Sequence, residues 1–502
     1  MRKIAPLLLF LSLVSCTSVK KHNDQLEILI APEKLKKDVD FAHRKLQQLH
    51  PNLYWYISKE KLDFKFDSLK TTLNQPLKPN DFYQKLAPLI SDVKEGHLRL
   101  VPRSKRLTKA EIKNLKKQKG LLSRYNFVLD GDRIFVKDNT DKIPNMEVGT
   151  EILSIRDIPI KDLLSKYRPF VNSDGDNETF QKYILALRWP SYFTAEYGIL
   201  DSVKVETKYQ NEFKSFYLQR EKITKEEEKS TVGKTKDYNI ITKSYNRDLQ
   251  FATKDSTVAY MKIKTFSGTY SKKFYKESFA LLKNSPAKYL VLDVRDNLGG
   301  SLSEINNLYS YLVSEDFKFI NDIEITSRSS MFQAAYFSEF SNVIKPFAAI
   351  GYPFYLLGTT LSVKKVEEKF YLKNNGIFSV KKPKKNNFKG KIYVLINGSS
   401  FSAASILPSK LKHDRRATLV GEETGGANDG TVAGRYAVEK LPHSKLYLPI
   451  GLMLIQPNVE FTNTKKGVTP HHEIVLTTQQ ILQKKDLELD WVMNDIQNSA
   501  GK

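Results

Sequence analysis

Apolar residues recur at helical spacing in three segments near the N-terminus. The pattern predicts helices over 35–49, over 62–73 and from an N-cap at Asn80 onward. The pair His50-Pro51 should end the first of them, because proline cannot continue a helix. We therefore expect an N-terminal helical domain over residues 32–120, with its basic final stretch serving as a connection.

Residues 121–220 change to the alternating pattern of half-buried strands. The turn pairs Asp130-Gly131 and Gln210-Asn211 predict two hairpins, and Leu163-Leu164 indicate a short helix between them. A β-rich domain with one or two short helices is expected. The charged stretch 221–245 should link it to the next domain.

In residues 246–502, short apolar runs alternate with segments of helical spacing. Expected strands are 258–263, 288–294, 391–396 and 417–420, and expected helices lie near 272–283, 302–313 and after Ser402. Such alternation is typical of a layered α/β domain. The lysine-rich insertion 363–390 is expected to form a surface hairpin.

The N-terminus has the features of an export signal. Arg2 and Lys3 precede the apolar run Ile4–Val14, which is too short to anchor a chain across a bilayer. The segment ends in Leu13-Val14-Ser15-Cys16, which resembles the lipobox of bacterial lipoproteins, where lipid is attached to the cysteine. The alternative is a plain secretory signal with an incidental cysteine.

This resemblance implies that residues 1–16 are a signal peptide ending in a lipidated Cys16, and that 17–31 are a flexible tether. The protein is then expected on the periplasmic side of the cell envelope, anchored by lipid in the outer membrane. Cys16 is the only cysteine, so a disulfide within the chain and thiol chemistry are excluded.

Charge narrows the choice of partners. The 80 Lys and Arg residues exceed the 56 Asp and Glu residues, for a net charge of +24 at pH 7. In an exported protein, anionic lipid, glycan or acidic protein surfaces are the expected neighbours, and nucleic acid is not. Much of this charge is expected to be solvated surface.

The candidate chemistry centres on residues 391–412. A buried strand there runs into the turn Asn397-Gly398, and a helix begins at Ser402. A serine raised on such a strand-to-helix turn has an exposed hydroxyl beside free helix N–H groups, as acyl transfer requires. The alternative is that Ser402 and its neighbours only cap the helix.

Three further stretches accompany this turn. Leu292–Gly300 is a strand that ends in a glycine pair, Gly421–Gly426 is a second strand end, and Glu95-Gly96-His97-Leu98 lies far upstream. In this order the four stretches resemble the C-terminal-processing (tail-specific) serine proteases, which include the tricorn core and nisin-resistance-type proteases. The resemblance covers nearly all of the mature chain.

The resemblance implies a crotonase/ClpP-like layered α/β catalytic core with a PDZ-like insert over 121–220. It implies a serine peptidase that cleaves polypeptides, often near free C-termini, and Ser402 falls on the family nucleophile. The family oxyanion hole falls on the backbone of Gly299 and Gly300 and on the N–H of Ala403.

The family offers two kinds of general base. The serine–lysine type has a lysine just after the T-x-G turn, but this chain has Ala427 there. The histidine branch uses a G-H-T segment, which Gly96-His97 matches, although Leu98 replaces the threonine. A neutral imidazole accepts a serine proton at physiological pH, so His97 is the expected base.

The orienting group stays open. Ser405 stands where many relatives have a glutamate, and His471 replaces the aspartate of the family's G-V-x-P-D segment. Glu422 or Glu423 are candidates to orient His97, or are surface carboxylates. No metal-ligand spacing or phosphate-binding loop is present, so no metal or cofactor is expected.

Two other functions fit the same fold. The chain could be a catalytically silent binding or scaffolding lipoprotein, or a carrier of apolar ligands, as retinoid-binding relatives of this core are. The PDZ-like domain could bind peptide or act as a spacer.

Overall fold

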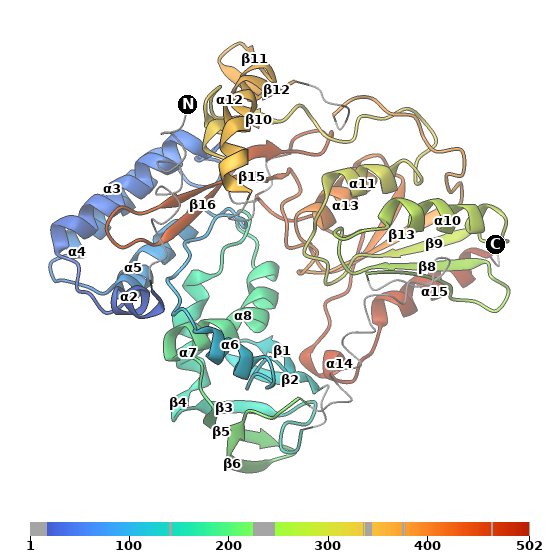
Figure 1. Cartoon of the computed structure of the whole chain (residues 1–502). Helices are drawn as coiled ribbons and strands as arrows, with labels where there is room; N and C mark the ends of the chain where they lie inside the picture. The colour runs from blue at the N-terminus through green and yellow to red at the C-terminus, as the bar shows by residue number, and fades with distance from the viewer. Residues whose placement is uncertain are drawn as a thin grey trace, which may run out of the picture.

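The computed structural model describes residues 18–139, 143–223, 246–334, 336, 344–373, 376, 378–462 and 465–500. The predicted signal peptide with Cys16, and most of the predicted linker 221–245, lie outside these residues. The described chain forms a mixed α/β fold with three sheets (Figure 1). No helix in these ranges is long and apolar enough to cross a bilayer.

The three expected N-terminal helices are present. They are α3 (Pro32–Leu49), α4 (Lys59–Thr72) and α5 (Pro79–Ser91). The prediction for the start of α5 was wrong, because Pro79 occupies its first turn and Lys78 is the N-cap. Asn80 instead joins α5 to the following segment: its side chain donates to the Arg103 carbonyl at 2.9 Å and accepts from the Arg103 N–H at 3.1 Å.

Two stretches expected to lack regular structure contain short helices. The predicted tether forms α2 (Val19–Asp24), capped by the Ser18 hydroxyl, and is followed by buried Leu26 and Ile30. The predicted basic connection contains α6 (Lys109–Leu115), which begins with a capping box between Thr108 and Glu111.

The middle unit is one antiparallel sheet in the order β1-β2-β3-β5-β6, with β4 beside β3. Both expected hairpins are present, but the sequence analysis missed a 19-residue helix, α8, which buries Trp189 against the sheet. The elements are β1 (Tyr125–Asp130), β2 (Arg133–Asn139), β3 (Glu151–Ile155), β4 (Ile158–Pro159), α7 (Ile160–Tyr167), α8 (Thr179–Tyr197), β5 (Ser202–Tyr209) and β6 (Glu212–Gln219).

The second sheet is the predicted α/β layer, in the order β17-β14-β13-β9-β8-β7. Its strands run parallel except for β7 at the edge, and the nearly unbroken apolar runs of β13 and β9 suit burial on both faces. The strands are β7 (Arg247–Phe251), β8 (Val258–Ile263), β9 (Tyr289–Asp293), β13 (Lys391–Ile396), β14 (Ala417–Gly421) and β17 (His472–Glu473).

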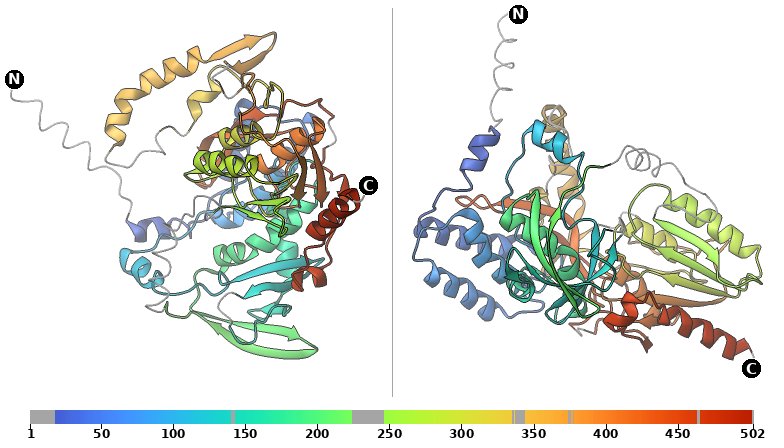
Figure 2. Two further views of the ribbon diagram at one scale, coloured as in Figure 1. Left: turned by 90° about the vertical axis from the view of Figure 1, so that its right-hand side faces the viewer. Right: turned by 90° about the horizontal axis from the view of Figure 1, so that it is seen from below.

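Helices cover both faces of this sheet. One face packs into the large core, together with α10 (Ser271–Lys283), α11 (Leu302–Tyr309) and α13 (Ala403–His413). The other face packs against α15 (Leu487–Ala500), which follows α14 (Thr478–Leu482). Figure 2 shows α15 crossing the outer side of the sheet. This layering places the carboxyl ends of β13 and β9 at one edge, beside the serine turn.

The third sheet is antiparallel, in the order β11-β12-β10-β16-β15, and its long hairpin β15–β16 lies along the N-terminal helices (Figure 1). Of the predicted surface hairpin 363–390, only 363–372 form one, as β11–β12, which follows helix α12. The elements are β10 (Glu324–Ile325), the 3-10 helix η3 (Ser330–Gln333), α12 (Lys345–Leu361), β11 (Val363–Val366), β12 (Lys369–Leu372), β15 (Thr431–Lys440) and β16 (Tyr447–Ile455).

Candidate active site

The serine turn is held in a strained conformation. Ser402 is the N-cap of α13 and has φ 57° and ψ −121°, a backbone region that costs a non-glycine residue about 1–3 kcal/mol. The end of β9 braces the turn, because the Ser400 hydroxyl donates to the Val294 carbonyl at 2.9 Å and the Phe401 N–H donates to the Asn297 carbonyl at 3.0 Å. The surrounding structure thus fixes a half-buried serine at a helix start.

Two glycines let a second backbone segment approach this serine. Gly299 has φ 99°, and a Cβ there would lie 2.7 Å from Ser402 Cβ and 3.0 Å from the Ala403 nitrogen. A Cβ on Gly300 would lie 2.3 Å from the Phe266 carbonyl oxygen. Since real Cβ atoms do not approach this closely, any other residue would push the two segments apart.

The backbone N–H groups beside Ser402 differ in availability. The Gly299 N–H donates to Asn297 Oδ1 at 2.8 Å. Within the described residues, the N–H groups of Gly300 and Ala403 have no acceptor. The Ala403 group is one of the unpaired donors that every helix start carries, so it is available to a negatively charged oxygen.

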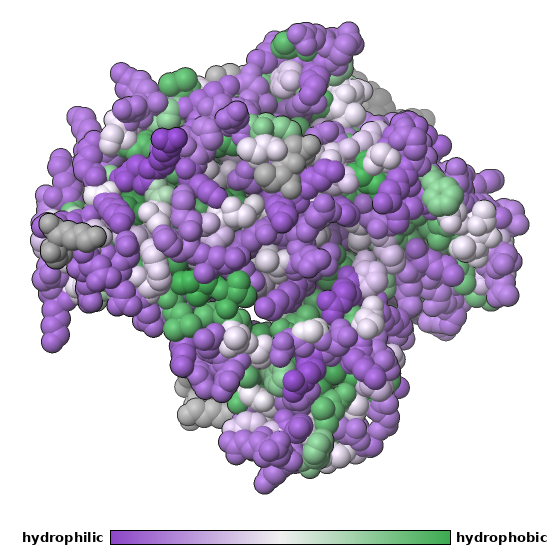
Figure 3. Space-filling view, turned by 180° about the vertical axis from the view of Figure 1, so that it is seen from behind, coloured by the Kyte–Doolittle hydropathy of each residue, from purple (hydrophilic) through white to green (hydrophobic). Residues whose placement is uncertain are grey.

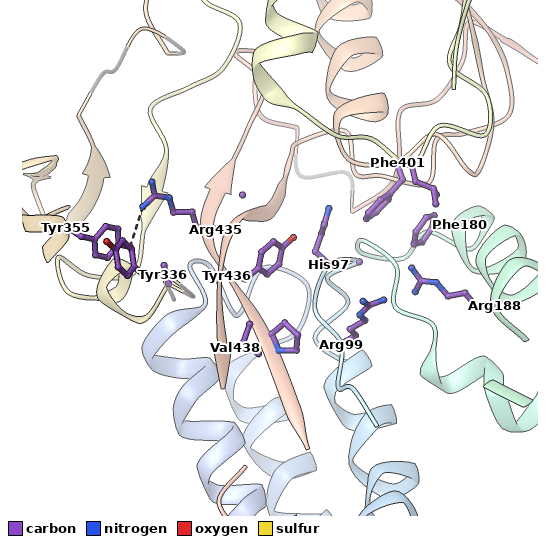
Figure 4. A pocket seen from close by; sticks show the side chains of 15 residues that line it. His97, Arg99, Phe180, Arg188, Tyr336, Tyr355, Phe401, Arg435, Tyr436 and Val438 are labelled. Carbon is purple, nitrogen blue, oxygen red and sulfur yellow. Dashed lines mark hydrogen bonds between the residues drawn. The ribbon is translucent and has the colours of Figure 1, made fainter. Parts of the chain in front are cut away.

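The imidazole of His97 lies against the serine turn. Its ring packs on Phe401, with centroids 4.6 Å apart, and Phe401 in turn stacks on Phe180 of α8 at 4.2 Å. Gly96 permits this packing, because a Cβ there would lie 2.7 Å from the Phe401 ring. Figure 4 shows His97 between Phe401 and Tyr436 of β15.

A hydroxyl and a carboxylate orient the imidazole. The Thr431 hydroxyl lies 2.9 Å from His97 Nδ1 and donates to Glu95 Oε1 at 3.0 Å, while Glu95 Oε2 accepts the Val432 N–H at 3.1 Å. Because the hydroxyl proton goes to Glu95, the Thr431 oxygen is left to accept from Nδ1–H. This arrangement favours the tautomer in which Nε2 is unprotonated, as a general base requires.

A second carboxyl, that of Asp174, lies beside this relay. Its oxygens accept the N–H groups of Gly96 at 2.7 Å and Ala427 at 3.1 Å. Burial raises the pKa of Glu95, and burial together with the neighbouring Glu95 raises the pKa of Asp174 well above its usual range. Burial also lowers the pKa of His97 below 6.5, so this imidazole is neutral at pH 7.

The ligand atoms of Glu95, His97 and Asp174 lie within 4.8 Å of one another, close enough in principle to share a metal ion. All four carboxylate oxygens, however, already accept hydrogen bonds from backbone N–H groups or from Thr431. These polar atoms are therefore satisfied by the protein itself.

In the structure, the ring of His97 lies against the turn that carries Ser402. The two side chains share no hydrogen bond, and within the described residues neither His97 Nε2 nor the Ser402 hydroxyl has another hydrogen-bond partner. Catalytic hydrogen bonds often form only once substrate is bound, so both atoms are free to engage one.

Glu422, Glu423 and Ser405, the possible orienting groups for His97, bond to the backbone instead. The carboxylate of Glu422 accepts the Gly398 N–H at 3.3 Å, and that of Glu423 accepts the Gly467 N–H at 2.6 Å. The Ser405 hydroxyl donates to the Ser402 carbonyl at 2.8 Å, one turn into α13. These groups brace the backbone around the serine turn, and in the described structure none of them contacts His97.

The sequence analysis missed the groups that do contact His97. Thr431 is 334 positions away, and nothing in its local sequence marks it. Glu95 carried a usable signal, since it lies two residues before His97 in the same short motif, and the Leu98 N–H, which donates to the Glu95 carbonyl at 3.0 Å, closes a turn that brings them together. Asp174 lies in a loop before α8, a helix that was itself missed.

A cavity of about 740 Å³ opens in front of the imidazole. Aromatic rings and three guanidinium groups surround it, as Figure 4 shows. The arginines come from three parts of the chain: the segment after His97, α8 and β15. The lining side chains labelled in the figure are His97, Arg99, Phe180, Arg188, Tyr336, Tyr355, Phe401, Arg435, Tyr436 and Val438.

Residues 257–474, somewhat less than half of the chain, match the model of Peptidase family S41. The matched residues include most of the α/β layer, the glycine pair and the serine turn. No curated protein matches the chain.

Two solved structures have a similar fold over most of the chain. Mature CPAF complexed with lactacystin matches with a TM-score of 0.60 at 16% identity, over 90% of this chain and 96% of that one. Mature CPAF alone matches with a TM-score of 0.59 at 15% identity, over 90% and 94% of the two chains. Because it covers 90% of this chain, the likeness in fold extends beyond residues 257–474 to the helical and middle units.

Proposed function

We propose that this chain is a serine peptidase in which Ser402 attacks a peptide carbonyl and His97 is the general base. His97 Nε2 takes the serine proton as the bond to carbon forms, and returns it to the leaving amine. Water then resolves the acyl-enzyme by the same proton transfers in reverse. The observation that carries this proposal is the strained backbone of Ser402 at a helix start, beside an imidazole whose tautomer is set by Thr431.

We assign the oxyanion to the backbone donors beside the serine. The Ala403 N–H supports this role best, because it is unpaired and belongs to a helix start. Gly300 supplies a second unpaired N–H, whereas that of Gly299 would first have to leave Asn297. Each donor aimed at the developing charge contributes roughly 3 kcal/mol to lowering the barrier.

The cavity supports a polypeptide substrate that carries a carboxylate. Arg99, Arg188 and Arg435 line it, and guanidinium groups bind carboxylates in a bidentate manner. A free C-terminus supplies such a group, which agrees with processing near C-terminal ends. We further propose lipid attachment at Cys16, and peptide binding by the middle unit in the manner of PDZ domains.

A fluorophosphonate probe tests the nucleophile directly. The wild-type protein should be labelled, Ser402→Ala should not be labelled at all, and His97→Ala should be labelled far more slowly. Ser409→Ala is the matched control: it removes a hydroxyl from the same helix, one bonded to the Asn428 carbonyl at 2.8 Å, and should leave labelling unchanged.

The other outcomes separate the alternatives. If folded wild-type protein is not labelled, the peptidase proposal is wrong and a binding or scaffolding role takes its place. Saturable uptake of a fluorescent lipid by the unlabelled protein would instead identify a carrier of apolar ligands.

A further inference from the structure

Helix α12 presents a row of apolar side chains to solvent. Ile350, Phe354, Leu357 and Leu361 are 71%, 73%, 58% and 61% exposed. Their spacing of four, three and four residues places them on one side of the helix. Single exposed apolar residues are ordinary, but a continuous row of four marks a surface that binds something apolar.

The opposite side of α12 is already packed. The Tyr355 hydroxyl donates to the Met331 carbonyl at 3.0 Å, and its ring packs on Tyr336 at 4.6 Å. Thr359 is buried one turn later. Because α12 packs on the rest of the protein through this side, the apolar row on its other side is not needed for the core.

A strongly basic segment lies on the same side of the molecule. Residues 103–119 contain eight Lys and Arg residues and one acidic residue, Glu111, whose carboxylate caps α6. The side chains of Lys109, Lys113, Lys116 and Lys117 are exposed and form no ion pair within the described part of the chain.

The first described helix is attached to this basic segment. His22 Nε2 lies 3.1 Å from the Ser104 carbonyl, and the Asn23 side chain donates to the Arg106 carbonyl at 3.0 Å. In both views of Figure 2, α2, α6 and α12 lie toward one side of the molecule. The apolar row, the free lysines and the start of the described chain thus share what we call the α2–α6–α12 side.

Figure 3 shows the back of the molecule, which is mostly hydrophilic but has a contiguous apolar patch beside the hollow at its centre. The α2–α6–α12 side is also where the described chain begins, at Ser18 before α2.

We propose that the α2–α6–α12 side binds the surface of an anionic lipid bilayer. The row on α12 enters the headgroup region, while the lysines of α6 and α2 contact lipid phosphates. A second copy of the chain is a poorer occupant, because it would bring the same positive charges together. Since Tyr355 of α12 also lines the cavity, binding would hold the cavity mouth close to the membrane.

The first test follows the helix directly and does not depend on peptidase activity. The full chain with Cys16→Ser carries a single new cysteine, Phe354→Cys, labelled with an environment-sensitive fluorophore. Vesicles of phosphatidylcholine with about one third phosphatidylglycerol should shift its emission to the blue, and vesicles of phosphatidylcholine alone should shift it much less. Phe213→Cys on β6 is the matched control, because Phe213 is equally exposed, at 71%, and should not respond.

The second test measures binding by vesicle flotation. Lys113→Glu, Lys116→Glu and Lys117→Glu together should weaken binding to the anionic vesicles by at least about tenfold. The same charge change on α10, Lys272→Glu, Lys273→Glu and Lys276→Glu, should have much less effect.

An unshifted Phe354→Cys signal on anionic vesicles would overturn the proposal, as would equal losses from the two lysine sets. Concentration-dependent dimer formation without lipid, abolished by Phe354→Gln, would assign the apolar row to a second copy instead. None of these readouts requires an active Ser402, so their failure is distinct from failure of the proposed peptidase function.

Discussion

Two buried acidic sites have pKa values shifted in opposite directions, although burial raises the pKa of the carboxyl groups in both. Asp293, at the end of β9, lies 3.0 Å from the Lys262 ammonium and 2.8 Å from the Arg295 guanidinium, and these cations hold its pKa at about 2. Asp174 and Glu95 lie among backbone N–H groups and an imidazole, and burial raises the pKa of both.

The difference separates a carboxylate that paired cations keep charged from two carboxyl groups whose protonated form burial favours. Paired cations keep Asp293 charged at every physiological pH, so it can only hold β9 and its neighbours together. The cluster around His97 has no directly paired cation in the described structure, and its protons can be redistributed when charge develops nearby. Five variants or measurements test this distinction, from the largest expected effect to the smallest.

Removal of the imidazole should have the largest effect. His97→Ala should lower kcat/KM on a fluorogenic peptide by about 10⁴-fold, because the serine then has no base, and should leave thermal stability nearly unchanged. His413→Ala, at the exposed end of α13, is the control. Activity within tenfold of wild type would show that another group is the base.

Removal of the structural carboxylate should affect stability and not chemistry. Asp293→Asn should lower the free energy of unfolding by about 3 kcal/mol, since it leaves Lys262 and Arg295 without their buried partner. Urea unfolding measures this loss. Asp486→Asn is the control: its carboxylate also pairs with Arg295, at 2.7 Å, but is 40% exposed, so the cost should be much smaller.

The ion pairs of Asp293 with Lys262 and Arg295 also predict how the stability of the fold depends on pH in the acid range. Because folding lowers the pKa of Asp293, its stabilising contribution is complete above 3.8 and is lost as the pH falls toward about 2. A loss that began near neutral pH would contradict this assignment.

Loss of the hydroxyl that orients His97 should have an intermediate effect on rate. Thr431→Val keeps the shape of the side chain but removes the link between Nδ1 and Glu95, so kcat should fall about 10²-fold, with little change in KM. Thr431→Ser should restore most of the rate. If valine and serine behave alike, the hydroxyl does not set the tautomer.

The pH dependence should show the smallest effect. The imidazole must be neutral to act as a base, and burial lowers the pKa of His97 below 6.5. The acid limb of kcat/KM should therefore have an apparent pKa below 6.5, with activity retained as the pH falls to that value. An acid limb with an apparent pKa above 6.5 would show that a neighbouring carboxylate raises the pKa of His97 more than burial lowers it.

Much of the fold follows from local patterns in the sequence. The strands β8, β9, β13 and β14 coincide with apolar runs, and α3 ends where His50-Pro51 requires. The missed helix α8 is apolar on several sides and contains Pro190, so it lacks a clear helical period. The sequence did not predict α2, because the contacts that hold this helix, to Ser104 and Arg106, come from a distant part of the chain.

The candidate site divides in the same way. Turn chemistry and family resemblance point to Ser402, the glycine pair and His97, because each lies in a recognisable short motif. The relay behind the imidazole does not follow from the sequence, since Thr431 and Asp174 reach it only through the packing of β15 and the middle unit. Glu422 and Glu423 have suitable chemistry, but their carboxylates are directed to backbone turns.

The placement of Phe401 has a mechanical consequence. Its ring belongs to the hydrophobic core of the middle unit, although its backbone is the peptide just before Ser402. Any tilt of α8 that moves Phe180 must move this ring, and with it both the serine and the imidazole that rests on the other face. The candidate active site is therefore mechanically joined to the middle unit through a single ring.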